Sequence, residues 1–485
     1  MPEAPQENFV ERTLSNIATG WRDIAQSAAR TVGLSKAPAS ARPASLIRLM
    51  KDCLEARGGE VSARMRAAAL GQLYLEMDAE GRERFLTVLA REFAVPSDQV
   101  AEAVAIYQAS VSDADRLNAE ALLRQALQPP RLRLLTQFNA LPEGVKFLVD
   151  LRADLLSLRS DDPYLQGLDN DLRRLLLSWF DTGFLDLRAI DWDSPASLLE
   201  KLVAYEAVHE ITSWQDLRNR LDSDRRCYAL FHPRMPEEPL AFVEVALVKG
   251  MAGSIQALLD ETAPKMDPKA ADAAIFYSIS NTQKGLKQIS FGDFLIKRVV
   301  QTLSREFPKI KIFSTLSPIP GFRRWLQSLP EAELSAGFEA DTLAMLPTLT
   351  SERGLKQTLA QLLDDPNWPD NATVSTALQR PLTLLAARYL MSKRPDGQPL
   401  DTVARFHLRN GARLERLNWL GDVSANGLAS SMGLMVNYRY PIDDIEANHE
   451  AYMKDGHIAL GQEMRGLSRS VGESSGSPRR RLGLG

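Results

Sequence analysis

The segment Ser278–Phe307 has the residue types and the order expected of an anion-binding loop. The apolar run Ala273–Thr282 predicts a strand, a loop with Gly285 and Gly292 follows, and FGDFLIKRVVQTLSREF predicts a helix with one buried stripe. A helix start presents free backbone N–H groups and the positive end of the helix dipole, which bind phosphate oxygens. Gly292 would let the backbone approach a ligand closely, although two glycines also occur in loops for turn geometry alone. The segment contains neither GxxxxGK[ST] nor GxGxxG.

The hydroxyl of Ser317 is a second candidate group. It lies in FSTLSPIPGF (Phe313–Phe322), after a run that predicts a strand over Lys309–Pro318. The prolines end the strand and fix the turn, so they would hold this hydroxyl at the rim of a sheet. A serine before a proline is also an ordinary turn residue, and the pattern alone leaves both interpretations open.

The imidazole of His407 is the third candidate. A histidine side chain gains or loses a proton near neutral pH and can therefore donate one in a reaction. His407 stands between Phe406 and Leu408, a setting typical of a core histidine as well. The stretch that follows is rich in Gly, Asn, Ser and Trp, which suits a ligand-lining surface more than a helix.

The elements that must position these groups fall into two halves. Up to about residue 185, strong helix formers dominate and β-branched runs are rare, which predicts a helical bundle with no obvious catalytic group. An exposed apolar seam on this bundle would suit self-association. We expect a helical oligomerisation domain over residues 1–185, a catalytic domain over 186–460 and a disordered tail over 461–485.

The second half mixes strands with helices. CYALFHP and PLAFVEVALVKG flank a turn over Pro233–Pro239 and predict an antiparallel hairpin. Helical patterns return from Leu343 to about Met391, and RLNWLGD and GLMVNYRYP are the last strand candidates. Strands and helices mixed in this way predict an α+β or α/β layered domain.

Composition excludes several classes of function. The 485 residues leave room for two or three domains, and 58 Lys and Arg against 62 Asp and Glu give a net charge of −4. This balance supplies no general attraction to nucleic acid or to anionic lipid. No apolar run is long enough to span a bilayer, and the first and last residues resemble no targeting signal. We therefore expect a cytoplasmic protein that binds neither nucleic acid nor membrane.

Cysteine and histidine spacing argues against a metal centre or a disulfide framework. The two cysteines, Cys53 and Cys227, form no CxxC pattern. None of the five histidines forms HxH or HExxH. The sequence thus predicts reduced thiols and no metal site.

Several segments together resemble the malonyl-CoA decarboxylase family. They are SISNTQKGL, FGDFLIKRVV, REFP, FSTLSPIPGF, FHLRNGA, NWLGDVS and GLMVNYRYP, joined upstream by FLDLRAIDWDSPASLLEKLVAYEAVHEI and RRCY. The resemblance covers nearly the whole chain, to about Tyr440, and its motifs occur in the expected order.

The resemblance implies an α+β fold class, with an amino-terminal all-α helical bundle followed by a GNAT acyltransferase-like mixed α/β catalytic domain. It implies decarboxylation of malonyl-CoA to acetyl-CoA and CO2 without metal or organic cofactor. It also implies a homotetramer formed through the helical domains. Because the chain carries neither a mitochondrial leader nor a peroxisomal signal, the resemblance favours a bacterial-type member in the cytoplasm.

The resemblance also assigns residues to the site. The family's catalytic serine and histidine correspond to Ser317 and His407. Its CoA-binding loop corresponds to Lys287, Gln288, Ile289, Ser290, Phe291, Gly292 and Asp293.

The expected chemistry needs three things from the protein. Loss of CO2 from a malonyl thioester leaves an enolate, so the site must hold the CoA pyrophosphate, stabilise the enolate oxygen and protonate the α-carbon. His407 is the expected proton donor, and Ser317 would hydrogen-bond either the leaving carboxylate or His407. Two other functions stay open at this point, an acyl-CoA-dependent N-acyltransferase and a non-catalytic acyl-CoA sensor.

Overall fold

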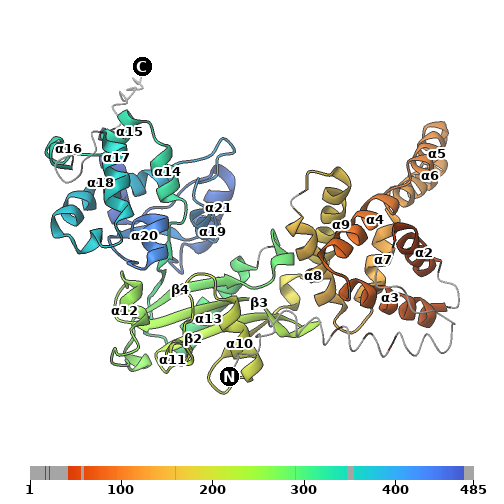
Figure 1. Cartoon of the computed structure of the whole chain (residues 1–485), viewed down its shortest axis with the longest axis horizontal. Coiled ribbons are helices and arrows are strands. Elements are labelled where there is room, and N and C mark those ends of the chain that lie inside the picture. The colour runs from red at the N-terminus through yellow and green to blue at the C-terminus, as the bar shows by residue number, and fades with distance from the viewer. Residues whose placement is uncertain are drawn as a thin grey trace. The chain divides into compact units, whose positions relative to one another are not determined.

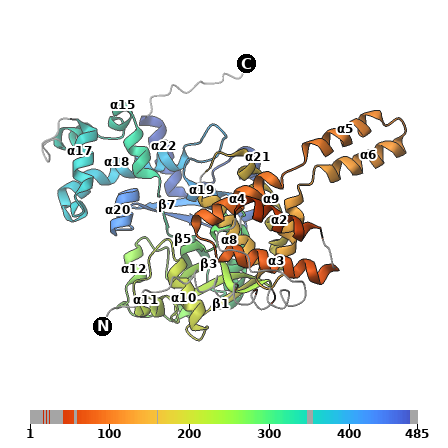
Figure 2. The same ribbon diagram turned by 45° about the vertical axis from the view of Figure 1, so that its right-hand side comes forward.

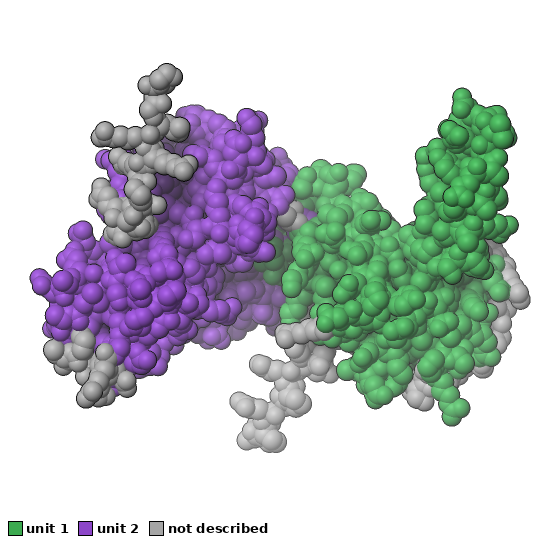
Figure 3. Space-filling model, turned by 90° about the horizontal axis from the view of Figure 1, so that it is seen from above, with its two compact units in different colours: residues 1–186, 230–240, 281–290 green, residues 187–229, 241–280, 291–485 purple. Residues whose placement is uncertain are grey.

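The computed structural model divides the chain into two compact units, and it describes residues 17, 21, 24, 42–55, 59–158, 160–289, 291–346 and 354–474. The first unit comprises Met1–Asp186, Leu230–Leu240 and Asn281–Ser290, and the second comprises Leu187–Ala229, Ala241–Ser280 and Phe291–Gly485 (Figure 3). Two short segments from the second half of the chain thus belong to the helical first unit. One of them contains the loop between the strand Ala273–Asn281 and the helix that follows.

The amino-terminal part of the first unit is built from helices (Figure 1), as the sequence predicts. They are α2 (Pro43–Leu54), α3 (Gly59–Leu75), α4 (Ala79–Glu92), α5 (Ser97–Ala109), α6 (Asp113–Ala126), α7 (Pro130–Asn139), α8 (Gly144–Ser157) and α9 (Pro163–Trp179). Asp78, Ser112 and Asp162 cap α4, α6 and α9, because each side chain accepts a hydrogen bond from a first-turn N–H group. Proline begins α2, α7 and α9, where its missing N–H has no helical partner to lose.

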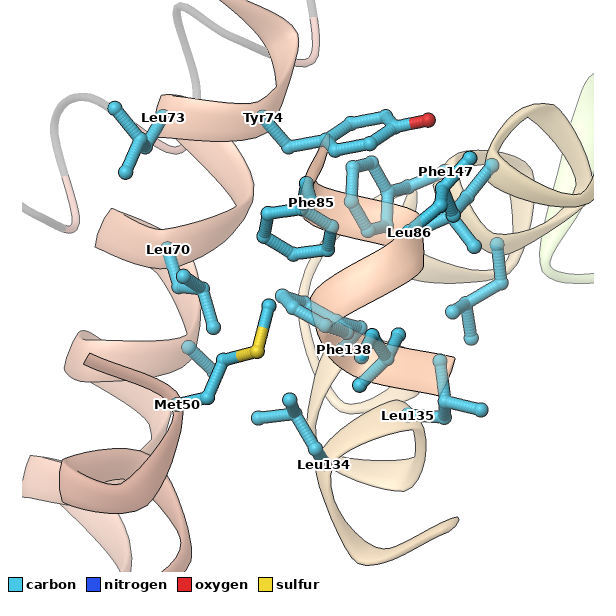
Figure 4. Packing of buried hydrophobic residues seen from close by; sticks show 14 of the residues in the cluster. Met50, Leu70, Leu73, Tyr74, Phe85, Leu86, Leu134, Leu135, Phe138 and Phe147 are labelled. Atoms are coloured by element: carbon cyan, nitrogen blue, oxygen red, sulfur yellow. The ribbon is translucent and has the colours of Figure 1, made fainter. Parts of the chain in front are cut away.

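An aromatic cluster forms the core of this unit. The ring of Phe147 lies 4.7 Å from that of Trp21 and 5.0 Å from that of Phe138, measured between ring centroids. Phe85 and Tyr74 add a second pair at 4.9 Å, and Figure 4 shows these side chains pointing into one shared interior. Aromatic burial on this scale is a large source of folding free energy for a helical bundle.

Helices α5 and α6 pack against each other and stand away from the rest of the helical unit (Figures 1 and 2). Ala103 and Ala119 are the buried residues of the pair. Its large apolar side chains are exposed instead; they include Ile106, Tyr107, Val111, Leu117, Leu122 and Leu127. The pair therefore leaves apolar surface uncovered within this unit.

An eight-stranded mixed sheet is the centre of the second half of the chain. Its strands are β1 (Asp186–Ile190), β2 (Arg225–His232), β3 (Met235–Val248), β4 (Ala273–Asn281), β5 (Ile312–Thr315), β6 (Ser317–Pro318), β7 (Arg413–Asn418) and β8 (Met435–Arg439). The order across the sheet is β1-β2-β3-β4-β5-β8-β6, and β7 pairs with β8. Strands β6, β7 and β5 all run antiparallel to β8.

Helices of the second unit lie between and after these strands in the chain. They are α10 (Ala196–Tyr205), α11 (Trp214–Arg220), α12 (Ile255–Leu259), α13 (Gly292–Glu306), α14 (Phe322–Ser328), α15 (Glu331–Ser335), α16 (Ala340–Met345), α17 (Leu355–Asp364), α18 (Ala372–Met391), α19 (Thr402–Arg409), α20 (Ala425–Ser431), α21 (Ile445–Asp455) and α22 (Gln462–Ser474). None of the helices in the described part of the chain has the length and apolarity needed to cross a membrane.

Strands β4 and β5 form a parallel pair with α13 as the crossover between them. The register pairs Ala273 with Ile312 and ends where Phe276 faces Thr315. Beyond that point the chain of β5 leaves β4, because Ser317 in β6 pairs with Val436 of β8. The two strands therefore diverge just before Ser317.

The predicted α+β fold class is confirmed: a helical amino-terminal part precedes a mixed α/β domain with the β4–α13–β5 unit at its centre. The buried stripe of α13 is confirmed as well, since Leu295, Val299 and Leu303 are inaccessible to solvent. The turn between β2 and β3 is shorter than predicted, because strand β3 begins at Met235 and includes Pro236–Pro239. Residues up to Ser474 of the expected tail form α22, and residues 475–485 lie outside the described residues.

Candidate active site

Ser317 and His407 lie side by side although 90 positions separate them in the sequence. Ser317 Oγ lies 3.2 Å from His407 Nε2, and both side chains are buried. Pairing of β6 with β8 fixes Ser317, while His407 belongs to α19, whose amino end is capped by the Asp401 carboxylate. The structure thus brings together the two groups that the sequence analysis singled out for catalysis.

Two further hydrogen bonds extend this pair into a chain. Ser317 Oγ donates to Thr315 Oγ1 at 2.8 Å, and His407 Nδ1 lies 2.7 Å from Tyr440 Oη. With the Ser317 proton directed to Thr315, the assignment that satisfies every group has His407 Nε2–H donating to Ser317 Oγ. The Tyr440 hydroxyl then donates to Nδ1.

Burial determines the charge of His407. Its imidazole is removed from water, which lowers the pKa of His407 to about 3 because the charged form loses its solvation. The free protein therefore holds a neutral imidazole at neutral pH. The expectation that His407 is readily protonated near neutral pH is wrong for the protein without substrate, and desolvation is the reason.

Tyr438 completes the surroundings of the imidazole. Its ring is stacked on that of His407, with centroids 4.5 Å apart and planes 25° from parallel. Among the described residues, its buried hydroxyl has no hydrogen-bond partner. A buried polar atom without a partner is uncommon and marks a place where a ligand or a water molecule can bind.

Sequence reasoning missed Thr315, Tyr438 and Tyr440. The alternation of the two tyrosines in NYRYP offered a signal, because residues two apart in a strand share a face. Which face they share depends on the pairing of β5 with β8, where Ser314 faces Arg439. That pairing joins segments more than a hundred residues apart, so no local pattern reveals it.

A second polar group lies on β4 beyond the last pair with β5. Ser278 Oγ donates to both carboxylate oxygens of Glu206, at 2.7 and 2.8 Å, and Ser280 Oγ donates to one of them at 3.3 Å. Backbone N–H groups of Val208 and His209 bind the same carboxylate. Ser278 is two residues past the end of the β4–β5 ladder, as is Ser317, so both line the place where these strands diverge.

The loop assigned to CoA binding follows β4. Lys287 and Gln288 are exposed, while Ile289 and Phe291 are buried. Ser290 lies outside the described residues, and of Asp293 only the backbone, in the first turn of α13, is described. Helix α13 begins at Gly292, and its N-cap residue Phe291 offers no side-chain acceptor to the first-turn N–H groups.

The structure gives Gly292 a packing role that the sequence did not suggest. A Cβ atom at this position would lie 2.0 Å from a ring carbon of Phe406, the residue before His407. Only glycine lets the first turn of α13 approach that ring. Close approach of a ligand at Gly292 stays a prediction beside this packing requirement.

No group of three or more His, Cys, Asp or Glu side chains is arranged to hold a metal ion within the ranges that the structure describes.

Comparisons with known proteins identify the family of this chain. The model of the malonyl-CoA decarboxylase C-terminal domain matches residues 183–476, and that of the malonyl-CoA decarboxylase N-terminal domain matches residues 93–180. The fold and the buried Ser317–His407 pair define a two-part α+β enzyme, and the matches specify which one. The chain belongs to the malonyl-CoA decarboxylase family.

Individual relatives are similar over most of their length. The mitochondrial malonyl-CoA decarboxylase of Anser anser anser is 37% identical over 421 residues, covering 83% of each chain. That of Rattus norvegicus is 38% identical over 408 residues, covering 80% of this chain and 82% of the relative. The crystal structure of malonyl-CoA decarboxylase from Rhodopseudomonas palustris is 43% identical with a TM-score of 0.79, covering 88% of this chain and all (100%) of that one. The structure from Agrobacterium vitis is 41% identical with a TM-score of 0.76, covering 87% of this chain and 99% of that one.

Proposed function

We propose that this protein converts malonyl-CoA to acetyl-CoA and CO2, as a carboxy-lyase, at the Ser317–His407 pair. The observation that carries the proposal is the 3.2 Å contact between Ser317 Oγ and His407 Nε2 inside a buried, hydroxyl-lined site. Membership of the malonyl-CoA decarboxylase family supports the choice of substrate.

The reaction breaks the bond between the α-carbon and the carboxylate. Its electron pair moves into the thioester carbonyl as an enolate, CO2 leaves, and the α-carbon then takes up one proton. His407 donates that proton from Nε2. The imidazole is neutral in the free protein, and the negative charge of the bound malonyl group, close to a buried imidazole, raises its pKa and recruits the proton.

Ser317 and Tyr440 hold the imidazole in position for this transfer. They contact its two nitrogens, at 3.2 Å and 2.7 Å, so the ring cannot rotate without losing both hydrogen bonds. Once His407 is charged, Nδ1–H donates to Tyr440 Oη, and the Nε2 proton that is bonded to Ser317 Oγ in the free protein is the one transferred to the α-carbon. Ser317 is the hydrogen-bonding partner of the imidazole in this scheme, and a positioned general acid contributes about 10² to 10⁴ in rate.

The nucleotide part of the substrate is assigned to the loop before α13. The residues proposed to bind it are Lys287, Gln288, Ile289, Ser290, Phe291, Gly292 and Asp293. Support comes from the exposed Lys287 and from the first-turn N–H groups of α13, which have no side-chain cap.

A direct assay tests the activity. The purified protein is incubated with malonyl-CoA and no acceptor amine, and release of CO2 with stoichiometric acetyl-CoA is the expected result. Acyl transfer that requires an added amine would indicate that the protein is an N-acyltransferase and not a decarboxylase. Tight binding of malonyl-CoA without turnover at micromolar enzyme would indicate a non-catalytic acyl-CoA sensor.

We also propose that the protein is a bacterial-type, cytoplasmic homotetramer. The two bacterial structures are more similar in sequence, at 43% and 41%, than the animal relatives at 37% and 38%. The apolar surface of the α5–α6 pair supports assembly through the helical part, because Val111 and Leu117 are 94% and 66% exposed.

The oligomeric state is tested by light scattering. The double variant Leu117→Glu/Leu122→Glu should lower the measured mass below that of a tetramer, because it places charges at two exposed apolar positions of α6. Val61→Glu, at an apolar position on α3 that is also exposed, is the control. An unchanged mass in the double variant contradicts assembly through this helix pair.

A further inference from the structure

Arg152 is a buried arginine of the helical unit, and two of its partners lie in or just before the loop assigned to CoA. Its side chain, in α8, is 1% exposed. One guanidinium nitrogen, Nη1, donates to the backbone carbonyls of Gly285 at 2.6 Å and Lys287 at 3.0 Å. Its Nε donates to Asp169 Oδ1 at 2.7 Å, so the α9 carboxylate fixes the orientation of the guanidinium.

The loop backbone is pressed against the same helix. A Cβ atom on Gly285 would lie 1.7 Å from the carbonyl oxygen of Val149 in α8, which leaves room for glycine alone. The side chains of Thr282 and Gln283 both bind the carbonyl of Pro239 and secure the start of the loop. Residues 282–287 are therefore held from two sides within the first unit.

Three side chains of this segment are open to solvent while Arg152 holds two of its backbone carbonyls. Lys284, Lys287 and Gln288 are exposed, so two cationic side chains and one amide project from this short segment. Gln288 has a φ of 68°, a left-handed conformation that costs a non-glycine residue roughly 1–2 kcal/mol. Such strain persists only where neighbouring contacts impose it. The hydrogen bond from Arg152 to the carbonyl of Lys287 is a contact of this kind, one residue before Gln288.

We propose that Arg152 is a positioning residue for nucleotide binding: by holding the carbonyls of Gly285 and Lys287, it sets the conformation in which the loop binds the phosphates of CoA. The inference rests on the proposed CoA-binding function of this loop. Arg152 does not contact substrate in this scheme and acts only through the loop backbone. The helical part of the chain would then contribute to substrate affinity as well as to assembly.

Arg131 supplies a matched control for a purely structural arginine. It belongs to the same unit and is similarly buried, its Nε donates to Asp171 Oδ2 at 2.7 Å, and its Nη1 donates to the carbonyl of Ala90 at 2.7 Å. These partners lie in α9 and α4. Arg131 thus makes the same kinds of contact as Arg152, to a carboxylate and to a backbone carbonyl. The carbonyl that it binds belongs to a helix and not to the loop.

The experiment compares Arg152→Lys with Arg131→Lys. Lysine keeps the charge but cannot orient several donors at fixed angles. We expect Arg152→Lys to raise the KM for malonyl-CoA and the Kd for CoA by about tenfold with little change in kcat, the pattern of lost uniform binding. Arg131→Lys should change the melting temperature while KM and Kd stay near the wild-type values.

A milder pair keeps the test decisive if either lysine variant folds poorly. Asp169→Asn and Asp171→Asn remove the charge that orients each arginine, and only Asp169→Asn should raise Kd for CoA, by roughly threefold. Equal effects of the two members in both pairs, or effects on stability alone, would overturn the positioning role. Wild-type CO2 release is measured in the same series, so loss of this inference leaves the decarboxylase assignment standing. An unchanged Kd for CoA in Lys287→Ala would instead contradict CoA binding by this loop. The positioning role of Arg152 would then be wrong as well.

Discussion

The core of the helical unit and the interior around His407 are both closed to water, yet they are built from different chemistry. In the first, the rings of Trp21, Phe138 and Phe147 contact one another, and the polar atoms of its Trp and Tyr side chains have hydrogen-bond partners. Trp21 Nε1, for example, donates to the carbonyl of Pro142. Such a core stabilises the fold through many apolar contacts, and it does not depend on the exact position of any single atom.

The interior around His407 buries hydroxyl and imidazole groups. Ser317, Thr315 and Tyr440 are linked to the imidazole in one hydrogen-bonded chain, while the hydroxyl of Tyr438 has no partner among the described residues. Buried polar groups cost stability unless they are paired, so such a site is retained for chemistry. The difference indicates that substitutions in the two interiors should separate stability from turnover.

The largest effect is expected in the aromatic core. Phe147→Ala removes a ring that contacts Trp21, Phe138 and Tyr74, and it should lower the free energy of unfolding by about 3–5 kcal/mol. Urea unfolding of variant and wild type gives this number, and kcat per folded molecule should stay unchanged. A small loss of stability with a large loss of turnover would contradict the separation of a stabilising core from a catalytic interior.

His407→Ala should show the opposite behaviour. Removal of the proton donor should lower kcat by at least about 10²-fold while the Kd for CoA stays nearly intact. Steady-state kinetics and CoA calorimetry on the same preparation give both quantities. Turnover close to wild type would count against His407 as the proton donor.

Protonation of His407 should make this interior sensitive to acid. The pKa of His407 is lowered from 6.5 to about 3 in the folded protein, so between these values the unfolded chain binds the proton and the folded one does not. Stability present at neutral pH is therefore lost as the pH falls below 6.5, by up to about 2 kcal/mol at pH 5. Urea unfolding at pH 7 and pH 5 should show a smaller pH difference in His407→Gln than in wild type. An identical change in unfolding free energy between pH 7 and pH 5 in both proteins would show that groups other than His407 cause the acid sensitivity.

The smallest effects are expected from the hydroxyl groups that position the imidazole. Tyr440→Phe removes the 2.7 Å partner of Nδ1 but keeps the ring, and kcat should fall by about tenfold, since one hydrogen bond to a charged group is worth roughly 1.5 kcal/mol. Ser317→Ala should likewise lower kcat more than it weakens binding. A rise in KM alone for either variant would contradict a role in holding His407.

Much of the fold follows from local pattern. The helical first half, the β2–β3 hairpin and the α13 stripe are all set by short-range periodicity and turn residues, so the sequence predicts them. The end of the chain is different, because α22 carries Ser and Gly residues that resemble a tail and is helical nonetheless. Packing of α22 with α18 overrides that weak local preference.

The site divides in the same way. The motifs that carry the family resemblance led to Ser317 and His407, which the structure brings together. Thr315 and Tyr440 could not be found, since their contacts arise from the long-range pairing of β5 and β8. Arg152 was hidden for another reason: an arginine in a helix predicts a solvent-exposed charge, and only the fold shows that it binds two loop carbonyls.

The contact between Gly292 and Phe406 has a mechanical consequence. Because the ring occupies the volume that any larger residue at 292 would need, the start of α13 cannot shift toward α19 without displacing Phe406. His407 is the next residue along α19. A shift of the first turn of α13 toward α19 would thus act, through van der Waals contact, on the residue that precedes His407.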